Sequence, residues 1–321
     1  MDVLSEVLSI CRSEGAVSAR FALTAPWGLR SDGVSGALIR MARGAPYWMH
    51  VQGTQPVLVN PGDLVMVPLG APHSIVSALG APEETFSRLI AQHAVGPRYE
   101  NPLVFSHGGG GELTDMFSAH VWFSHYCRHT VFRILPPYIH IREQDLSIIK
   151  CLATTMQLLI IETLDRRAGW RLSASRMGEL LLVNILRDHL SRESAIGEGW
   201  LRGLTDPAVA RAIMCMHRQP HQSWTVDSLA SEAGMSRSRF FTRFKELVGT
   251  SPINYLTAHR MALAAEQLEA GVLHLGGIAE GAGYESEKVF ARAFRRWSGV
   301  TPKVYSHREK MRRSQPLNVD G

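Results

Sequence analysis

The sequence contains one pattern twice near its C-terminal end. Residues 240–255 read FFTRFKELVGTSPINY, and residues 290–305 read FARAFRRWSGVTPKVY. Five pairs are identical at a constant offset of 50, namely Phe240/Phe290, Phe244/Phe294, Gly249/Gly299, Pro252/Pro302 and Tyr255/Tyr305. A second short helical pattern precedes each copy, at residues 229–234 and 278–283. The duplication predicts two helix-turn-helix units in tandem, and the second helix of such a unit reads the major groove of DNA.

The positive charge of the chain is concentrated in the region of these repeats. Residues 205–313 contain 16 Lys and Arg against 10 Asp and Glu, whereas residues 1–204 contain 18 of each. A localised cationic surface is what the neutralisation of phosphates requires. A charge that serves only solubility is the alternative, but its coincidence with the repeats favours a DNA partner.

The second helix of each repeat has one apolar and one polar face. Apolar residues recur at i, i+4 and i+7 in both copies, so this stripe should pack on a three-helix core. The stripes are Phe240, Phe244 and Leu247, then Phe290, Phe294 and Trp297. The opposite faces carry Arg237, Ser238, Phe241, Thr242 and Lys245, then Glu287, Lys288, Ala291, Arg292 and Arg295. Arg, Glu and Phe can read base edges, whereas Ser, Thr and flanking Arg residues can hold phosphates instead.

A long helix should connect the two units. Residues 252–270 fit this role because Pro252 suits the first turn of a helix and Gly271 its end. About 19 residues at 1.5 Å each span roughly 28 Å, which is close to the ~34 Å between successive major-groove faces. The spacing predicts that one chain places both second helices in adjacent grooves on one side of the duplex.

The rest of the chain divides into a strand-rich region and a helical pair. The length of 321 residues predicts about two domains. Short apolar runs cut by Gly and Pro over residues 17–141 indicate a small β-barrel or sandwich, with a surface loop at residues 106–112. Helices are expected at residues 146–168 and at residues 175–190, the latter capped by Ser173. Their apolar surface exceeds what one packing contact requires, which favours a dimer interface over packing on the strands alone.

These elements give an α+β fold with an all-α C-terminal domain. The predicted domain bounds are 1–192 for a sensor and dimerisation domain, 193–205 for a linker, 206–308 for the DNA-binding domain and 309–321 for a basic tail. Cys11, Cys127, Cys151 and Cys215 form no CxxC pair, which is typical of reduced thiols in a cytosol. The sequence shows no secretory signal and no membrane-length apolar run, so a cytoplasmic protein without a membrane partner is expected.

Residues 199–306 resemble the DNA-binding domain of the AraC family of bacterial transcription regulators. The resemblance rests on SLASEAGMSRSRFFTRFKELVGTSPINYL and GGIAEGAGYESEKVFARAFRRWSGVTPKVYS. It implies that Ser238, Phe241, Thr242, Glu287, Lys288, Val289 and Arg292 face the DNA. With their neighbours, the candidate DNA-binding residues are Arg237, Ser238, Arg239, Phe241, Thr242, Arg243, Ser286, Glu287, Lys288, Val289 and Arg292.

The strand-rich region resembles the cupin-type sensor of one AraC subfamily. Residues 62–73 read GDLVMVPLGAPH, which is similar to the second motif of the cupin β-barrel, and the resemblance extends weakly to residues 132–141. It implies a domain that senses a small molecule or a stress signal. Trp48, His50 and His73 are the candidate residues of its effector pocket.

A cupin enzyme is the first alternative function. Such an enzyme needs a cluster of His and carboxylate metal ligands. His50 and His73 stand at motif positions, but Gln52 and Gln55 occupy the remaining ligand positions. Two histidines with two amides would hold a divalent metal poorly. We therefore expect no catalytic residues, no metal and no cofactor.

Two further features leave alternatives open. His120, His125, Cys127 and His129 stand close together in sequence and can be read as a zinc or copper site or as surface histidines at a strand end. Cys11 or Cys127 can sense oxidants only if its thiolate is exposed and stabilised by Arg12 or Arg128.

The sequence thus predicts a sequence-specific transcription regulator whose N-terminal domain senses a small molecule. Its expected partners are double-stranded promoter DNA, an unidentified effector and a second copy of the chain, and RNA polymerase is a further candidate. A nonspecific nucleic-acid-binding protein is the second alternative. It would bind all sequences with one affinity and a steep salt dependence, whereas a specific regulator should prefer its own site by at least ~10³.

Overall fold

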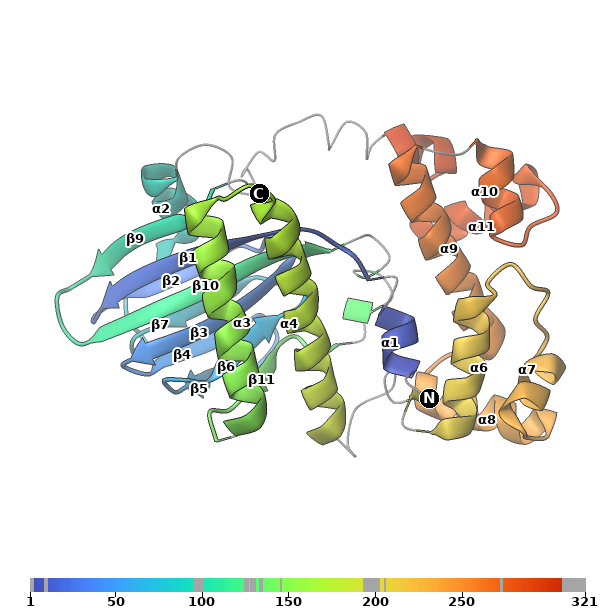
Figure 1. The fold of residues 1–321 in the computed structure, drawn as a ribbon, viewed down its shortest axis with the longest axis horizontal. Coiled ribbons are helices and arrows are strands. Elements are labelled where there is room, and N and C mark those ends of the chain that lie inside the picture. Colours follow the sequence, from blue (N-terminus) through green and yellow to red (C-terminus); the bar gives the residue numbers. More distant parts are fainter. Residues whose placement is uncertain are drawn as a thin grey trace. The chain divides into compact units, whose positions relative to one another are not determined.

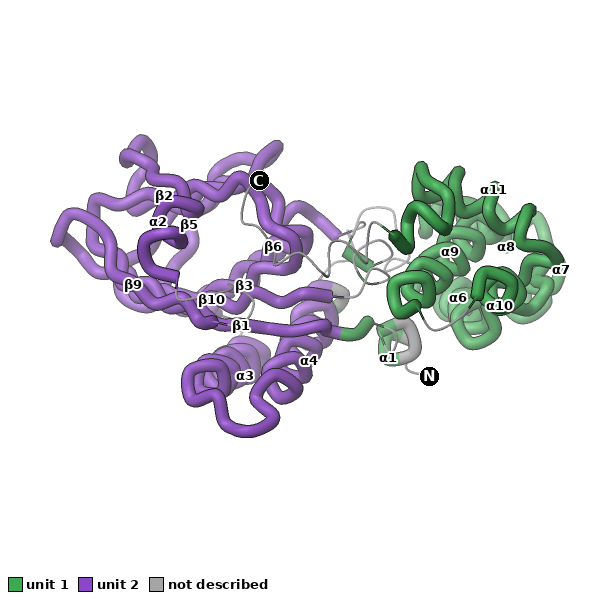
Figure 2. Tube along the Cα trace, turned by 90° about the horizontal axis from the view of Figure 1, so that it is seen from above, with its two compact units in different colours: residues 1–12, 124–134, 190–316 green, residues 13–123, 135–189, 317–321 purple. Residues whose placement is uncertain are grey.

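The structure is a computed structural model, and it describes residues 3–8, 11–94, 101–123, 127, 131–132, 135–144, 146–192, 203–204, 206–271 and 274–307. The chain forms two compact units (Figure 2). The strand unit comprises the described residues of 13–123 and 135–189, and the helical unit comprises the described residues of 1–12, 124–134 and 190–316. The domain bounds expected from the sequence stay a prediction, and the compact units divide the chain at additional points.

Two sheets build the strand unit. The six-stranded sheet has the order β11-β6-β3-β10-β1-β9, and the five-stranded sheet has the order β5-β4-β7-β2-β8. The strands are β1 Ser13–Thr24, β2 Gly28–Ser31, β3 Ala37–Gly44, β4 Tyr47–Val51, β5 Val57–Val59, β6 Leu64–Val67, β7 His73–Val76, β8 Glu84–Thr85, β9 Leu103–Gly108, β10 Leu113–Phe123 and β11 Ile139–Ile141. Side chains from both sheets share one apolar core. The expected cupin-like strand domain is confirmed.

Alternation along the strands decides which side chains enter this core. On β4, Tyr47, Met49 and Val51 are buried, whereas Trp48 is half-buried and His50 is exposed. Successive side chains of a strand point to opposite faces, so the core lies on the side of Tyr47. Helix α2 (Phe86–His93) lies against β2, β8 and β9, where it buries Leu89 in the same core.

Two long helices cover the outer face of the six-stranded sheet (Figure 1). Helix α3 spans Leu146–Asp165 and packs on β1 and β10, where the hydroxyls of Ser18 and Thr163 lie 2.5 Å apart. Helix α4 spans Trp170–Arg192. Residue 178 faces β10 so closely that a Cβ on Gly178 would come within 2.6 Å of Val121 Cγ1.

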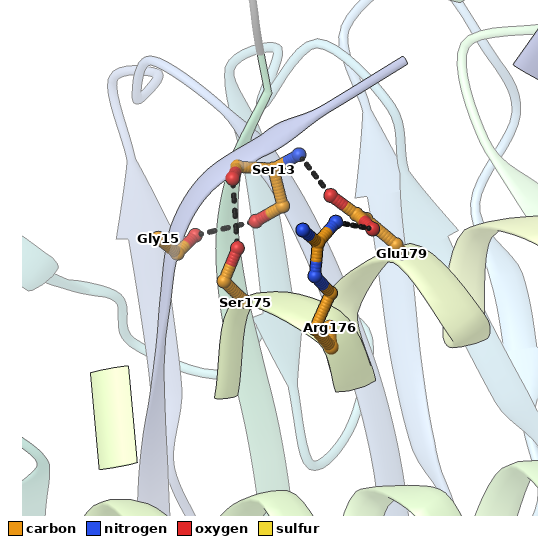
Figure 3. Close-up of polar contacts among 5 residues, drawn as sticks. All are labelled: Ser13, Gly15, Ser175, Arg176 and Glu179. Carbon is orange, nitrogen blue, oxygen red and sulfur yellow. Dashed lines mark hydrogen bonds and ion pairs between the residues drawn. The ribbon is translucent and has the colours of Figure 1, made fainter. Parts of the chain in front are cut away.

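The start of β1 is fixed to α4 by hydrogen bonds (Figure 3). The Ser13 amide donates to Glu179 Oε1 at 2.9 Å, and Ser175 Oγ donates to the Ser13 carbonyl at 2.7 Å. Arg176 holds the other oxygen of Glu179 at 2.7 Å. The expectation that α4 begins at residue 175 with a Ser173 cap is wrong, because the helix begins at Trp170, directly after Gly169 with its positive φ of 88°.

The loop between β9 and β10 is shorter than the sequence suggested. A surface loop was expected over residues 106–112, but β9 continues to Gly108 and pairs in parallel with β1. Gly108 takes a φ of 125°, and a Cβ there would meet the Thr24 carbonyl. Glycine at this position allows the strand to end against β1, so the turn is confined to residues 109–112.

The helical unit contains both repeats. Its helices are α1 Val3–Leu8, α6 Pro207–Arg218, α7 Val226–Ala233, α8 Arg237–Val248, α9 Pro252–Ala270, α10 Leu275–Gly281 and α11 Glu287–Ser298. The expected helix-turn-helix fold of this unit is confirmed, and α9 is the long helix that connects its two repeats. α1 packs against α6, and Leu8 and Cys11 at its C-terminal end are buried. No described helix is long and apolar enough to cross a membrane.

The ends of α9 follow from three residues. Ser251 accepts a hydrogen bond from the Asn254 amide at 3.3 Å, and Pro252 occupies the first helical position. Gly271 ends the helix with a left-handed φ of 67°. A serine cap, an early proline and a terminal glycine are the signals that delimit helices in a sequence. They explain why the bounds of α9 could be predicted.

Candidate DNA-binding surface

Each repeat folds around the same pair of phenylalanines. In the first repeat, Phe240 and Phe244 are fully buried, with their ring centroids 5.6 Å apart. In the second, Phe290 and Phe294 are fully buried at the same separation of 5.6 Å. Aromatic pairs of this geometry contribute beyond the area they bury. The two second helices, α8 and α11, are therefore held on their cores by matching anchors.

The turns of the two repeats differ by one residue. In the first, the Met235 amide donates to the Ala230 carbonyl at 3.0 Å, and in the second the Tyr284 amide donates to the Ala279 carbonyl at 2.9 Å. These bonds close helices α7 and α10. α8 then begins after Ser236 and α11 after Ser286. The offset between the copies consequently grows from 49 in the first helices to 50 in the second.

The structure exposes every side chain that the sequence proposed for DNA binding. Phe241 is 38% exposed and Val289 is 44% exposed. On α8 the exposed candidates are Arg237, Ser238, Arg239, Phe241, Thr242 and Arg243. At the start of α11 and along it they are Ser286, Glu287, Lys288, Val289 and Arg292. The exposed face of each helix lies opposite its buried phenylalanines, as an amphipathic helix requires.

Two of the basic side chains on α8 form ion pairs within the protein. The Arg243 guanidinium lies 2.8 Å from Asp206, which also accepts from the Ala208 and Val209 amides at the start of α6. Burial raises the pKa of Asp206, but these hydrogen bonds and the Arg243 charge lower it by more. Arg237 lies 3.2 Å from Asp227. Arg243 thus ties α8 to α6, in addition to any contact with DNA.

The basic side chains on α11 are available for contacts with DNA. Within the described part of the chain, Lys288, Arg292 and Arg295 form no ion pair, and all three are exposed. Ser286 Oγ accepts from the Val289 amide at 3.4 Å and so caps the helix. A capped helix with unpaired basic side chains on one face is suited to hold phosphates or base edges.

Helix α9 separates the two second helices. α8 packs on α6, α7 and α9, whereas α11 packs on α9 and α10. At 1.5 Å for each of its 19 residues it spans about 28 Å. The two exposed faces are therefore not buried against each other, as reading by both helices requires.

The candidate effector pocket is only partly assembled. His73 is buried, and its Nε2 lies 2.8 Å from Arg40 NH1, while Nδ1 donates to the Ala71 carbonyl at 2.7 Å. Burial, followed by the Arg40 charge, lowers the pKa of His73 to about 3, so its Nε2 accepts from Arg40. His50 is exposed and contacts the Thr54 carbonyl at 3.0 Å. Trp48 and His50 lie on the face of β4 opposite the core, and His73 lies inside.

Sequence reasoning missed the residues that accompany His73 in the interior. Arg40 is 3% exposed, and Trp27 and Tyr47 are 1% and 0% exposed. A signal was present in the run GALIRMARG, where one arginine interrupts an apolar strand. Alternation places Arg40 on the same face as Leu38 and Ala42, which belong to the core.

Two of the four candidate metal ligands, His120 and Cys127, are described, and both are buried. His120 is buried, and its Nε2 donates to the Ser35 carbonyl at 2.8 Å. Cys127 is buried, while His125 and His129 lie outside the described residues. Cys11 is also buried, which removes the exposure that an oxidant sensor requires. Among the described residues, no three potential ligands gather to hold a metal ion.

Comparison with known proteins agrees with this architecture. The profile of the Cupin family matches residues 2–191, and that of a helix-turn-helix domain family matches residues 229–308. A protein of Streptomyces lividans described as an AraC-like transcription regulator is 32% identical over 314 residues, which cover 95% of this chain and 98% of that protein. A Streptomyces antibioticus protein of the same description is 31% identical over 310 residues, with coverage of 95% and 98%.

One similar solved structure is the DNA-binding domain of AdpA in complex with a target DNA. It is 31% identical to this chain, covers 34% of this chain and 98% of its own, and has a TM-score of 0.33. The full-length relatives are described as transcription regulators, and nothing in these comparisons supports the enzyme alternative. This chain belongs to the AraC family of DNA-binding transcription regulators.

Proposed function

We propose that this regulator binds a specific promoter half-site through the exposed faces of α8 and α11, inserted into successive major grooves. The observation that carries the proposal is the shared construction of the two helices. Each buries two phenylalanines on one face and exposes all the candidate DNA-binding side chains on the other. The length of α9, about 28 Å, is close to the ~34 Å between successive major-groove faces.

Selection of genomic DNA fragments by the purified full-length protein at physiological salt tests this function. The expected result is a motif with two contact blocks about one helical turn apart. Specific binding should exceed binding to unrelated DNA by at least ~10³. Equal affinity for all fragments, with only the usual salt dependence, would show a nonspecific nucleic-acid-binding protein instead.

Arg292 is the side chain on which base reading can be tested most directly. It is exposed, and it forms no ion pair among the described residues. Replacement of Arg292 by alanine should weaken binding to the selected site about tenfold to a hundredfold, and much less to a scrambled duplex. Fluorescence anisotropy at one fixed salt concentration measures both affinities.

Arg88→Ala is the matched control for Arg292→Ala, because Arg88 is an exposed arginine on α2 of the strand unit. It removes one positive charge without touching α8 or α11. Its affinity for either duplex should stay close to that of the unaltered protein. An equal loss of Arg292→Ala on both duplexes would assign Arg292 to a phosphate.

Two copies of the chain should associate through the exposed side of α3. Leu158 and Ile161 are 49% and 40% exposed on this helix. Cys151 and Thr154 are exposed at the helical spacing that places them on the same stripe. An apolar stripe that recurs along a surface helix marks an interaction site, and a symmetric dimer is the commonest way to cover it.

Leu158→Glu should break this dimer. The new carboxylates would be buried against each other across the symmetry axis, so the dimer dissociation constant should rise at least about tenfold. Sedimentation of the two proteins at the same concentrations measures the change. Leu58→Glu is the matched control, because Leu58 is 39% exposed on β5 of the five-stranded sheet and does not lie on α3. A dimer that survives Leu158→Glu would refute this interface.

Control by a small molecule completes the proposed function. The cupin-type strand unit is joined to a DNA-binding unit in one chain, and a barrel of this kind is a common site for small ligands. The coupling between effector and DNA is an analogy with the family. We also propose RNA polymerase as a partner and the cytoplasm, where the DNA lies, as the place of action.

A further inference from the structure

The strand unit encloses a charged side chain that has no acidic partner. Arg40 on β3 is 3% exposed. NH1 donates to His73 Nε2 at 2.8 Å, and the guanidinium lies 5.6 Å from the centroid of the Phe86 ring. Within the described residues no Asp or Glu forms an ion pair with it. Asp63 is buried in the same unit, but its carboxylate already has other partners. It lies 2.8 Å from His140 Nε2 and accepts hydrogen bonds from the Asn60 and Glu143 amides.

A lone buried cation is costly for a folded protein. Ions leave water only at a large penalty, which a charged partner and hydrogen bonds must offset. Burial lowers the pKa of Arg40 to about 10, so the guanidinium remains charged at neutral pH. Burial raises the pKa of Tyr47, so this phenol stays neutral and supplies no counterion. The negative charge that balances Arg40 must therefore come from outside the described protein residues.

Three polar atoms in this core make no hydrogen bond. They are Arg40 Nε, Tyr47 Oη and Trp27 Nε1, and the rings of Trp27 and Tyr47 lie 6.2 Å apart. All three can donate a hydrogen bond. Buried donors are nearly always paired in folded proteins. The Arg40 guanidinium and these unpaired donors could together bind an anionic oxygen.

We propose that Arg40, Tyr47 and Trp27, with His73 orienting the Arg40 guanidinium, form the head-group site for a small organic monocarboxylate, bound inside the strand unit with its apolar body in the core. This inference rests on the proposed function, because it identifies the chemistry of the effector. One guanidinium balances one carboxylate, and an Arg–carboxylate pair is the strongest common hydrogen-bonded ion pair. A phosphate dianion would need a second cation, and the neutral His73 does not supply one.

The surroundings of the cluster select the rest of the ligand. The side chains that share the core with Trp27 and Tyr47 are apolar, including Phe21, Met49 and Ile75. A ligand with a hydrocarbon or aromatic body gains by burial in such a site, whereas a sugar or a polyamine does not.

Phe86, the first residue of helix α2, lies beside the cluster. The Phe86 ring lies over the buried Arg40 guanidinium, but Phe86 itself is only half-buried. One aromatic side chain therefore lies between the charge and the protein surface. We assign Phe86 as the residue that covers the carboxylate site.

Thermal unfolding of the full-length protein with benzoate and hexanoate, and with the neutral benzamide and hexanamide, tests the site. A ligand that binds only the folded state raises the unfolding midpoint. At saturation at least one carboxylate should raise the midpoint by about 5 °C or more, and its amide should not. No shift with either acid would overturn the proposal.

The Arg40→Met variant locates the response. Methionine fills a similar volume without charge, so the variant should fold and should lose the carboxylate-dependent shift, with an affinity at least about tenfold weaker. Arg43→Met, on the exposed end of the same strand, should keep the full response. An equal shift in Arg40→Met would overturn the proposal. If Arg40→Met fails to fold, Phe86→Ala should still change the affinity for the carboxylate, and an unchanged affinity would refute the site.

DNA binding separates this inference from the proposed function. A protein that reads its site but ignores both acids would retain the proposed DNA-binding function and refute the carboxylate site. A protein that binds benzoate through Arg40 but shows no DNA preference would retain the carboxylate site and refute the proposed DNA-binding function.

Discussion

Replacement of Phe244 by alanine is expected to destabilise the first helix-turn-helix by about 3–5 kcal/mol and to weaken DNA binding strongly. The Phe244 side chain is fully buried. The centroid of its ring lies 5.6 Å from that of Phe240 and 5.8 Å from that of Tyr255. Truncation of a buried phenylalanine costs about 3–5 kcal/mol, because apolar contacts are lost and a cavity remains. Native domains are stable by only ~5–15 kcal/mol, so a large share of the stability should be lost.

Urea unfolding followed by circular dichroism measures this loss, and anisotropy measures DNA binding. Phe241→Ala is the matched control, because Phe241 is the next aromatic on α8 but points outward. It should change the free energy of unfolding by less than ~1 kcal/mol and still weaken binding to the selected site. If Phe244→Ala were as stable as Phe241→Ala, the paired phenylalanines would not be the anchors of α8.

Acidification below about pH 6.5 should destabilise the helical unit through His217 and His259. Both rings are buried and stacked with centroids 4.0 Å apart, and His217 Nε2 lies 2.8 Å from Tyr255 Oη. Burial lowers the pKa of His217 to about 3. Burial, followed by the His217 and Arg260 charges, lowers the pKa of His259 well below its ordinary value. Both histidines are therefore neutral in the folded state at neutral pH.

The direction of the effect follows from these lowered pKa values. Between the ordinary value near 6.5 and the folded value near 3, the unfolded chain binds protons that the folded chain excludes. The stability is full above pH 6.5 and falls as the pH decreases, by up to about 1.4 kcal/mol per pH unit for each histidine. Chemical unfolding at a series of pH values gives the slope.

His259→Phe should reduce that slope by the share of one histidine and keep an aromatic ring in the stack. His274→Gln is the control, because His274 is exposed at the start of α10. It should leave the slope unchanged. A pH profile that is the same in His259→Phe and in the unaltered protein would exclude this histidine pair as the source of acid sensitivity.

The C-terminal fold was predictable because its signals are local. Repeated phenylalanines at helical spacing, Ser251 and Pro252 at the start of α9 and Gly271 at its end all act within one or two turns. The duplication provided a second, independent copy of the same pattern. The candidate DNA-binding residues could be chosen from periodicity because each helix buries its apolar residues on one face. That periodicity does not specify which base each exposed side chain contacts.

The interior of the strand unit was less predictable because it depends on strand register. Trp27, Arg40, Tyr47 and His73 come from different strands or turns. β4 and β7 pair within the five-stranded sheet, whereas β3 belongs to the six-stranded sheet, so the packing of the two sheets brings Arg40 to His73. The motif around His73 pointed to the correct strand, but Trp48 and His50 were assigned to the pocket without regard to alternation on β4. A shift of one residue moves every side chain of a strand to the other face.

The packing of α1 on α6 bears on how such a regulator can exchange parts with its relatives during evolution. The described residues among the first 12 belong to the helical unit, as do those of 124–134, so this unit is assembled from three separated stretches of the chain. A recombination that transfers only the C-terminal third would separate α6 from the helix that covers it and uncover the neighbours of the buried Leu8 and Cys11. If this DNA-binding unit were inherited as a single C-terminal segment, we would therefore expect polar substitutions on the face of α6 that α1 covers here.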